Sequence, residues 1–147
     1  MHIIDKLKSK NMSVIKMPKK GNYLRNKWVR NFANHLSERE KEDIYLVDSN
    51  GLVGYLWHLF SFNKKDYLEG EKAEQAFNNE RKGKCYVFFQ HSKYALLLED
   101  ASMLHTNDLT VEGHTDIYIV DENYNWTFVI THENGWLGPY FSRREEI

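Results

Sequence analysis

The sequence predicts an α+β fold: an antiparallel sheet of about five strands with helices packed on one face. Apolar residues at helical spacing dominate the first half of the chain, and short apolar segments that fit hairpins dominate the second. The chain has 147 residues, of which 41% are hydrophobic, which is enough apolar surface for one core. We therefore treat residues 1–147 as a single domain.

The first half predicts one strand and two helices. Residues 13–17 fit a short strand that ends at Pro18. A helix over residues 22–35 follows, because four large apolar residues recur every fourth position: Leu24, Trp28, Phe32 and Leu36. Ser37 and Glu40 then have the spacing of a capping box. They predict the start of a short helix that buries Ile44 and Tyr45.

The rest of the chain predicts mainly strands. Residues 52–62 are rich in aromatic and branched side chains and fit a strand after a turn at residues 48–51. A helix is expected from about residue 66 to Gly83. Two hairpins follow, and their paired segments are residues 85–90 with 94–99, and 116–120 with 126–132. Residues 134–147 hold a compact aromatic cluster and a charged end.

Charge is unevenly distributed along the chain. Residues 1–36 hold nine basic side chains against one acidic side chain, a net +8, and the remainder carries −9, so the total is −1. Residues 1–21 read as a basic N-terminal arm with a short strand. Three roles stay open, in this order: the arm folds on its own acidic body, it binds an oppositely charged protein, or it binds nucleic acid. The acidic remainder would repel a polyanion, so we expect no nucleic-acid partner.

The expected compartment is the cytoplasm. The N-terminus lacks the apolar run of a secretory signal, and no segment approaches the roughly 18 apolar residues of a spanning helix, so no membrane partner is expected. A single cysteine, Cys85, forms no disulfide within the chain. No phosphate-binding glycine loop and no paired metal-ligand motif occurs, and we expect no cofactor and no metal.

Several sequence segments resemble, in order and spacing, a family of small Bacillus-type cytoplasmic proteins classed as a domain of unknown function. The most specific are GNYLR at 21–25, FANHLS at 32–37, WHLFS at 57–61, THE at 131–133 and GPYF at 138–141. The resemblance runs from about Ser13 to Phe141. It implies a single-domain bacterial protein and assigns neither an activity nor catalytic residues.

Five residues are candidates for chemistry: His58, His91, His132, Glu133 and Cys85. The three histidines lie in or at the ends of expected strands, where they could converge as ligands or acid–base groups. We favour the alternative that each is a hydrogen-bonded structural residue, because no histidine spacing supports a site. Cys85 alternates with Val87 and Phe89, which is the pattern of an inert core thiol. The possible pocket walls are Trp57, Trp136 and Tyr140.

We expect a non-enzymatic protein-interaction domain, of an immunity or regulator type, that contacts its partner through the basic N-terminal segment. The evidence is the aromatic content, the charge polarity and the lack of catalytic spacing. The alternative is a small hydrolase or metal-dependent enzyme that uses a His/Glu/Cys cluster on the sheet. The position of the three histidines in space separates these hypotheses.

Overall fold

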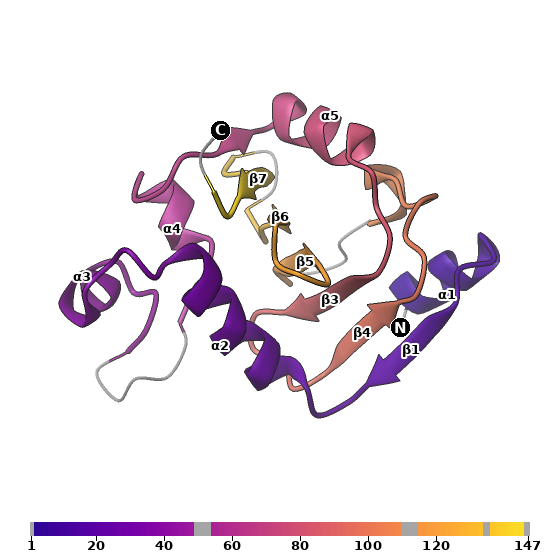
Figure 1. The fold of residues 1–147 in the computed structure, drawn as a ribbon, viewed down its shortest axis with the longest axis horizontal. Coiled ribbons are helices and arrows are strands. Elements are labelled where there is room, and N and C mark those ends of the chain that lie inside the picture. The colour runs from indigo at the N-terminus through magenta and orange to yellow at the C-terminus, as the bar shows by residue number, and fades with distance from the viewer. Residues whose placement is uncertain (1, 49–53, 110–114, 134–135, 146–147) are drawn as a thin grey trace.

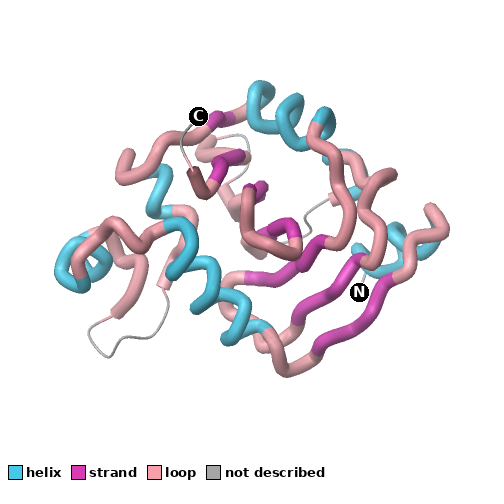
Figure 2. Tube along the Cα trace, in the orientation of Figure 1, coloured by secondary structure: helices cyan, strands magenta, loops and turns pink. Residues whose placement is uncertain are grey.

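The computed structural model describes residues 2–48, 54–109, 115–133 and 136–145. The helices in these residues are α1 (His2–Ser9), α2 (Gly21–Phe32), α3 (Glu38–Asp43), α4 (His58–Ser61), α5 (Glu71–Asn79) and the 3-10 turn η1 (Thr106–Asp108). The strands are β1 (Val14–Met17), β2 (Leu68–Glu69), β3 (Cys85–Phe89), β4 (Ala95–Leu98), β5 (Ile117–Asp121), β6 (Trp126–Ile130) and β7 (Tyr140–Arg143). The α+β class is therefore confirmed (Figures 1 and 2).

The strands form one antiparallel sheet in the order β1-β4-β3-β5-β6-β7-β2. The expected number of about five strands is only roughly right, because seven are present in the described residues. β1, β4 and β3 run across the view in Figure 1, whereas β5, β6 and β7 are seen nearly end-on. The sheet thus twists strongly across its width, as antiparallel sheets of L-residues do.

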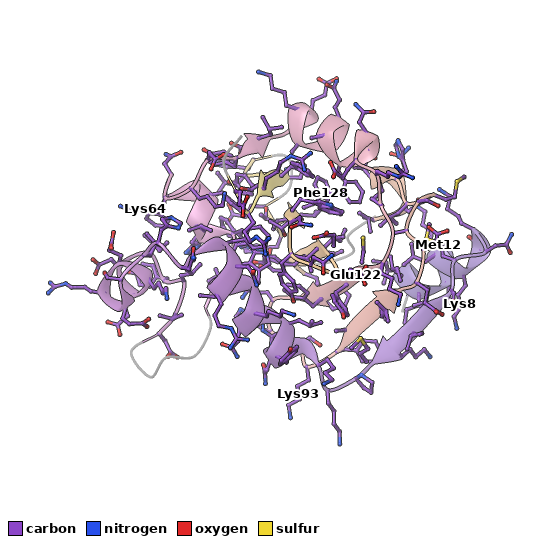
Figure 3. All side chains as sticks on the ribbon, viewed as in Figure 1. Lys8, Met12, Lys64, Lys93, Glu122 and Phe128 are labelled. Carbon is purple, nitrogen blue, oxygen red and sulfur yellow. The ribbon has the colours of Figure 1, made fainter. Side chains whose placement is uncertain are left out.

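Helices cover both faces of the sheet, so the expectation that they pack on one face is wrong. Val87 of β3 packs in a cluster with Leu7 of α1 and Phe77 of α5. The next residue, Phe88, packs in the opposite cluster with Trp28 of α2. Successive residues of a strand point to opposite faces, and here both are apolar, so both faces need a cover. Figure 3 shows Phe128 in the interior, on the α5 side.

The N-terminal segment is a folded part of the molecule and not a free arm. Its short strand is confirmed as β1, but α1 precedes it and buries Ile3, Ile4 and Leu7. Lys10 Nζ lies 2.7 Å from Asp108 Oδ2, an ion pair that joins this segment to the acidic remainder. The sequence pattern does not predict α1, because this helix contains few apolar residues.

The predicted helices around Ser37 are confirmed. In α2, Leu24, Trp28 and Phe32 are all buried, as their spacing requires. The Ser37 hydroxyl accepts from the Glu40 amide at 3.1 Å, and the Glu40 carboxylate accepts from the Ser37 amide at 3.0 Å. These bonds lower the pKa of Glu40.

After the capping box, the predicted burial of Tyr45 is wrong. Ile44 is buried, but Tyr45 adopts a positive φ of 58° and is 67% exposed. The left-handed turn at this position directs the ring of Tyr45 outward.

The expected strand over residues 52–62 is wrong where the structure describes it. Leu56 and Trp57 form a turn and α4 follows it, while residues 49–53, which include most of the expected turn, lie outside the described part. The buried residues are Leu56, Trp57, Leu59 and Phe60. That spacing is helical and not alternating, so burial favours a helical turn although the composition favours a strand.

Both hairpins are confirmed as β3–β4 and β5–β6. Two short strands were not expected. β7 lies within the aromatic tail and pairs with β6, and β2 pairs with β7 just before α5. α5 therefore begins at Glu71 and not near Asp66. None of the described helices has the length and apolar character needed to cross a bilayer.

Candidate functional site

The polar side chains of the candidate site lie just beyond the ends of several strands, at one end of the sheet. Phe89, the last residue of β3, pairs with Ile117, the first of β5, and Ile117 pairs with Ile130, the last of β6. Residues just beyond these positions therefore meet in space. They are Gln90, Asp116 and the segment from Thr131 to Glu133.

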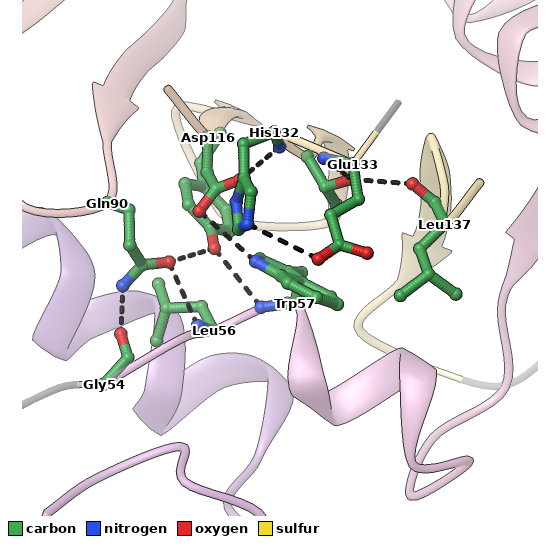
Figure 4. A network of polar contacts seen from close by, with 10 residues as sticks. Gly54, Leu56, Trp57, Gln90, Asp116, His132, Glu133 and Leu137 are labelled. Atoms are coloured by element: carbon green, nitrogen blue, oxygen red, sulfur yellow. Dashed lines mark hydrogen bonds and ion pairs between the residues drawn. The ribbon is translucent and has the colours of Figure 1, made fainter. Parts of the chain in front are cut away.

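Gln90 and Tyr118 hold the segment that leads into α4 (Figure 4). Gln90 Oε1 accepts hydrogen bonds from the Tyr118 hydroxyl and, at 3.2 Å, from the Leu56 amide. The Trp57 amide donates to the Tyr118 hydroxyl oxygen at 3.2 Å. Burial raises the pKa of Tyr118 well above its usual value, so this hydroxyl stays a neutral donor.

The three candidate histidines converge on Tyr55. Ring centroids lie 5.3 Å from Tyr55 to His58, 5.1 Å from Tyr55 to His91 and 6.2 Å from Tyr55 to His132. Trp57 also contacts His58, at 4.6 Å, and His132, at 5.8 Å. Residues that are far apart in the sequence thus form one aromatic and imidazole surface.

Asp116 is the polar centre of this surface. Its side chain is only 2% exposed. Oδ1 accepts from His132 Nδ1 at 2.8 Å and from the His132 amide at 2.5 Å, while Oδ2 accepts from Trp57 Nε1 at 3.3 Å. A buried carboxylate bonded to Nδ1 selects the tautomer with its proton on Nδ1. Nε2 of His132 is then the free base, and it lies 3.7 Å from Glu133 Oε1.

A pocket of about 340 Å³ opens beside this pair. We call it the Tyr55 pocket, and its lining is Tyr55, Phe89, Gln90, His91, Ser92, Thr115, Asp116 and His132. Its volume is at the small end of the roughly 300–1,000 Å³ typical of ligand sites. It combines an aromatic wall with imidazole, hydroxyl and carboxylate groups, which suits a small polar ligand.

The remaining candidates lie elsewhere. Cys85 is fully buried in the cluster on the α1 and α5 side of the sheet, where desolvation raises its pKa to about 12. Tyr140 is buried against Phe60 and Tyr67 and does not line the Tyr55 pocket. Trp136 is 84% exposed, and residues 134–135 beside it lie outside the described part. Trp57 contacts the pocket histidines but is itself buried.

Sequence reasoning missed Tyr55, Gln90 and Asp116. In the sequence, Asp116 stands directly before the apolar run of β5, and a polar residue at a strand end is the one feature that points to it. Gln90 follows β3 in the same way. Across the described residues, no group of three or more His, Cys, Asp or Glu side chains is arranged to hold a metal ion.

His58 is a half-buried base at the border of the surface. Its Nδ1–H donates to the Ile44 carbonyl oxygen at 2.7 Å. The rings of Tyr45 and Phe62 flank it at 6.4 and 5.3 Å. Desolvation lowers the pKa of His58, although the Ile44 bond and the charges of Asp116 and Glu133 oppose that shift.

The lowered pKa of His58 predicts a loss of stability in mild acid. Its neutral form stabilises the fold above the unfolded-state pKa of about 6.5, and this contribution is lost as the pH falls through the lower folded-state value. Urea titrations between neutral pH and about pH 5 should show a shallower decline for His58→Gln, whose amide can still donate to Ile44. The exposed His35 is the control, and His35→Gln should keep the wild-type slope. Equal slopes in all three proteins would contradict the assignment.

Comparison with known proteins identifies a family but assigns no activity. The family model described as a domain of unknown function (DUF4275) matches residues 1–141. No curated protein and no solved structure matches the chain.

Proposed function

The chain belongs to the DUF4275 family, whose description assigns no activity, so we propose its function from the site: hydrolysis of a small polar substrate in the Tyr55 pocket. His132 is the general base. Its Nε2 takes a proton from a water molecule as the water oxygen bonds to the acyl carbon or phosphorus atom of the substrate. The bond from that atom to the leaving group then breaks, and the imidazolium gives its proton to the leaving group. This function is the enzymatic alternative that the sequence leaves open, with His132 as the base and Cys85 buried away from the pocket.

The observation that carries this proposal is the Asp116–His132 pair. Asp116 is buried, and three donors from His132 and Trp57 hold its carboxylate in place. A carboxylate held in this way orients the imidazole and stabilises the imidazolium that forms when His132 accepts a proton. Glu133 Oε1 lies 3.7 Å from Nε2, on the side of the ring away from Asp116.

Removing the base should abolish most of the turnover. We expect His132→Gln to lower kcat/KM by about 10²–10⁴-fold on a panel of p-nitrophenyl esters and phosphates. Asp116→Asn should also lower it, because an amide cannot accept from both His132 and Trp57 and carries no charge to stabilise the imidazolium. His35→Gln, which lies outside the pocket, should be unaffected.

A second measurement needs no substrate. Nitrogen-15 NMR of the imidazole should show neutral His132 with its proton on Nδ1 in the wild type, and this tautomer preference should weaken in Asp116→Asn because one of the two acceptor oxygens is lost. Neutral His132 protonated on Nε2 would contradict the proposal. Equal turnover by wild type and His132→Gln, at the rate of buffer alone, would contradict it as well.

Protein binding through the basic N-terminal segment is the second candidate. The observation that favours it is the position of β1, a lysine-flanked strand at the margin of the sheet. In this role the chain would be the interaction domain that its aromatic content and charge polarity suggest. For both candidates we propose a bacterial, cytoplasmic setting, which the family resemblance and the free Cys85 thiol support.

A further inference from the structure

The outer side of β1 is an open sheet edge. β1 is the terminal strand, and on its inner side it pairs with β4 with Val14 opposite Leu98. The Glu99 amide donates to the Ser13 carbonyl at 3.2 Å, so Ser13, Ile15 and Met17 face β4 with their main-chain groups. Val14 and Lys16 alternate with them and therefore present their N–H and C=O groups outward. No described strand pairs with that side.

Lysine side chains surround this edge. The exposed ones are Lys8 in α1, Lys16 in β1, Lys19 and Lys20 after it, and Lys93 in the turn before β4. The Lys93 carbonyl accepts from the Gly21 amide at 2.8 Å, which places that turn beside the end of the β1 segment. Figure 3 shows Lys8 and Lys93 near opposite ends of the margin that β1 forms.

The same lysines decide which strand can pair there. Two copies of β1 in antiparallel pairing would bring Lys16 of one copy close to Lys16 of the other, and like charges across a strand pair are destabilising. An acidic strand would instead meet complementary charge, and Ile15, which is 43% exposed, offers one apolar contact. The edge therefore discriminates against a second copy and favours an acidic extended segment.

We propose that the outer edge of β1 binds an extended, acidic segment of a partner protein as an added antiparallel strand. Main-chain bonds from Val14 and Lys16 supply the pairing, and the surrounding lysines supply the selectivity for acidic sequence. This inference rests on the protein-binding role and is independent of the Asp116–His132 pair.

The test uses a short capped peptide that alternates glutamate and valine. Fluorescence anisotropy should show binding to the wild-type chain and loss of affinity at high salt. Lys16→Glu should weaken binding by about tenfold or more, whereas Lys72→Glu, an equal charge change at an exposed position of α5, should stay within about twofold. A matched peptide of lysine and valine should not bind.

Strand pairing has its own readout. Hydrogen exchange should show that the amides of Val14 and Lys16 become protected on binding, while that of Ile15, already bonded to β4, does not change. Val14→Pro, which removes an outward N–H at constant charge, should weaken binding, and a urea titration of the variant checks that the lost packing of Val14 against the core has not unfolded the chain. A peptide N-methylated at alternate residues should also bind more weakly.

Other results would overturn the inference. These are no binding of the acidic peptide, equal binding of the N-methylated peptide, or tighter binding of single-stranded DNA that Lys16→Glu abolishes. If wild type and Lys16→Glu capture the same host protein equally, the protein-binding role stands but the edge of β1 is not its binding site. Absence of both capture and peptide binding would reject the role itself, and neither result bears on turnover at His132.

Discussion

Replacing Trp28 by alanine should lower the free energy of unfolding by about 3–5 kcal/mol, the cost of a large cavity in a packed core. The Trp28 side chain has 0% exposure, and its ring packs against Phe32 and Phe60 at 5.1 and 5.9 Å. Its Nε1–H donates to Thr127 Oγ1 at 2.9 Å. Alanine loses the ring contacts and this hydrogen bond together, out of a total stability of about 5–15 kcal/mol for a typical domain.

Trp136 provides a matched control, because the same substitution there removes a ring that is 84% exposed. Trp136→Ala should change stability by less than about 0.5 kcal/mol. Urea unfolding followed by far-ultraviolet circular dichroism measures both variants without relying on tryptophan fluorescence. Equal decreases in the free energy of unfolding at the two positions would show that Trp28 is not a main packing residue of the core on the α2 side.

Gly21→Ala should destabilise the protein by about 1–3 kcal/mol or more, the usual range for overpacking. A Cβ at this position would lie 2.2 Å from the Ser92 carbonyl oxygen and 2.8 Å from the Lys93 carbonyl carbon. Both are backbone atoms, so no side-chain rotation relieves the contact. α2 would have to move away from the turn before β4, and the loss would exceed the gain of about 1 kcal/mol in helix propensity.

Gly83 is the control for Gly21. An added Cβ there has no atom within 4 Å, so Gly83→Ala should be neutral or stabilise by about 0.4–1 kcal/mol through the unfolded chain. Thermal unfolding compares the two variants. In Gly21→Ala the contact with Ser92 should also distort the Tyr55 pocket, which that residue lines. A Tm equal to wild type in Gly21→Ala would mean that this close approach does not exist in solution.

Features encoded within a few neighbouring residues could be predicted. The four-residue spacing in α2 reports a buried helix face directly, and Ser37 with Glu40 forms the cap that their spacing indicates. The two hairpins follow the same principle, because a short turn brings their strands together without help from the rest of the chain.

The site depends on contacts that no local pattern contains. His91 and His132 meet at Tyr55 because β3 and β6 end beside the start of β5, and α4 brings His58 to the same ring. Asp116 could not be recognised as the partner of His132 from sequence, since fifteen residues and a hairpin separate them. Cys85 does not join the histidines, because strand alternation directs its side chain into the core on the α1 and α5 side of the sheet.

By itself, the sequence determined the α+β class, the buried face of α2, the capped start of α3, the two hairpins and the split between a basic N-terminal segment and an acidic remainder. The tertiary structure decided that the segment at residues 58–61 is helical, that Tyr140–Arg143 is a strand, and that helices cover both faces of the sheet. The reason is physical. Periodicity and capping act within one or two turns of chain, whereas long-range pairing and burial act between segments whose contact is set only when the whole sheet forms.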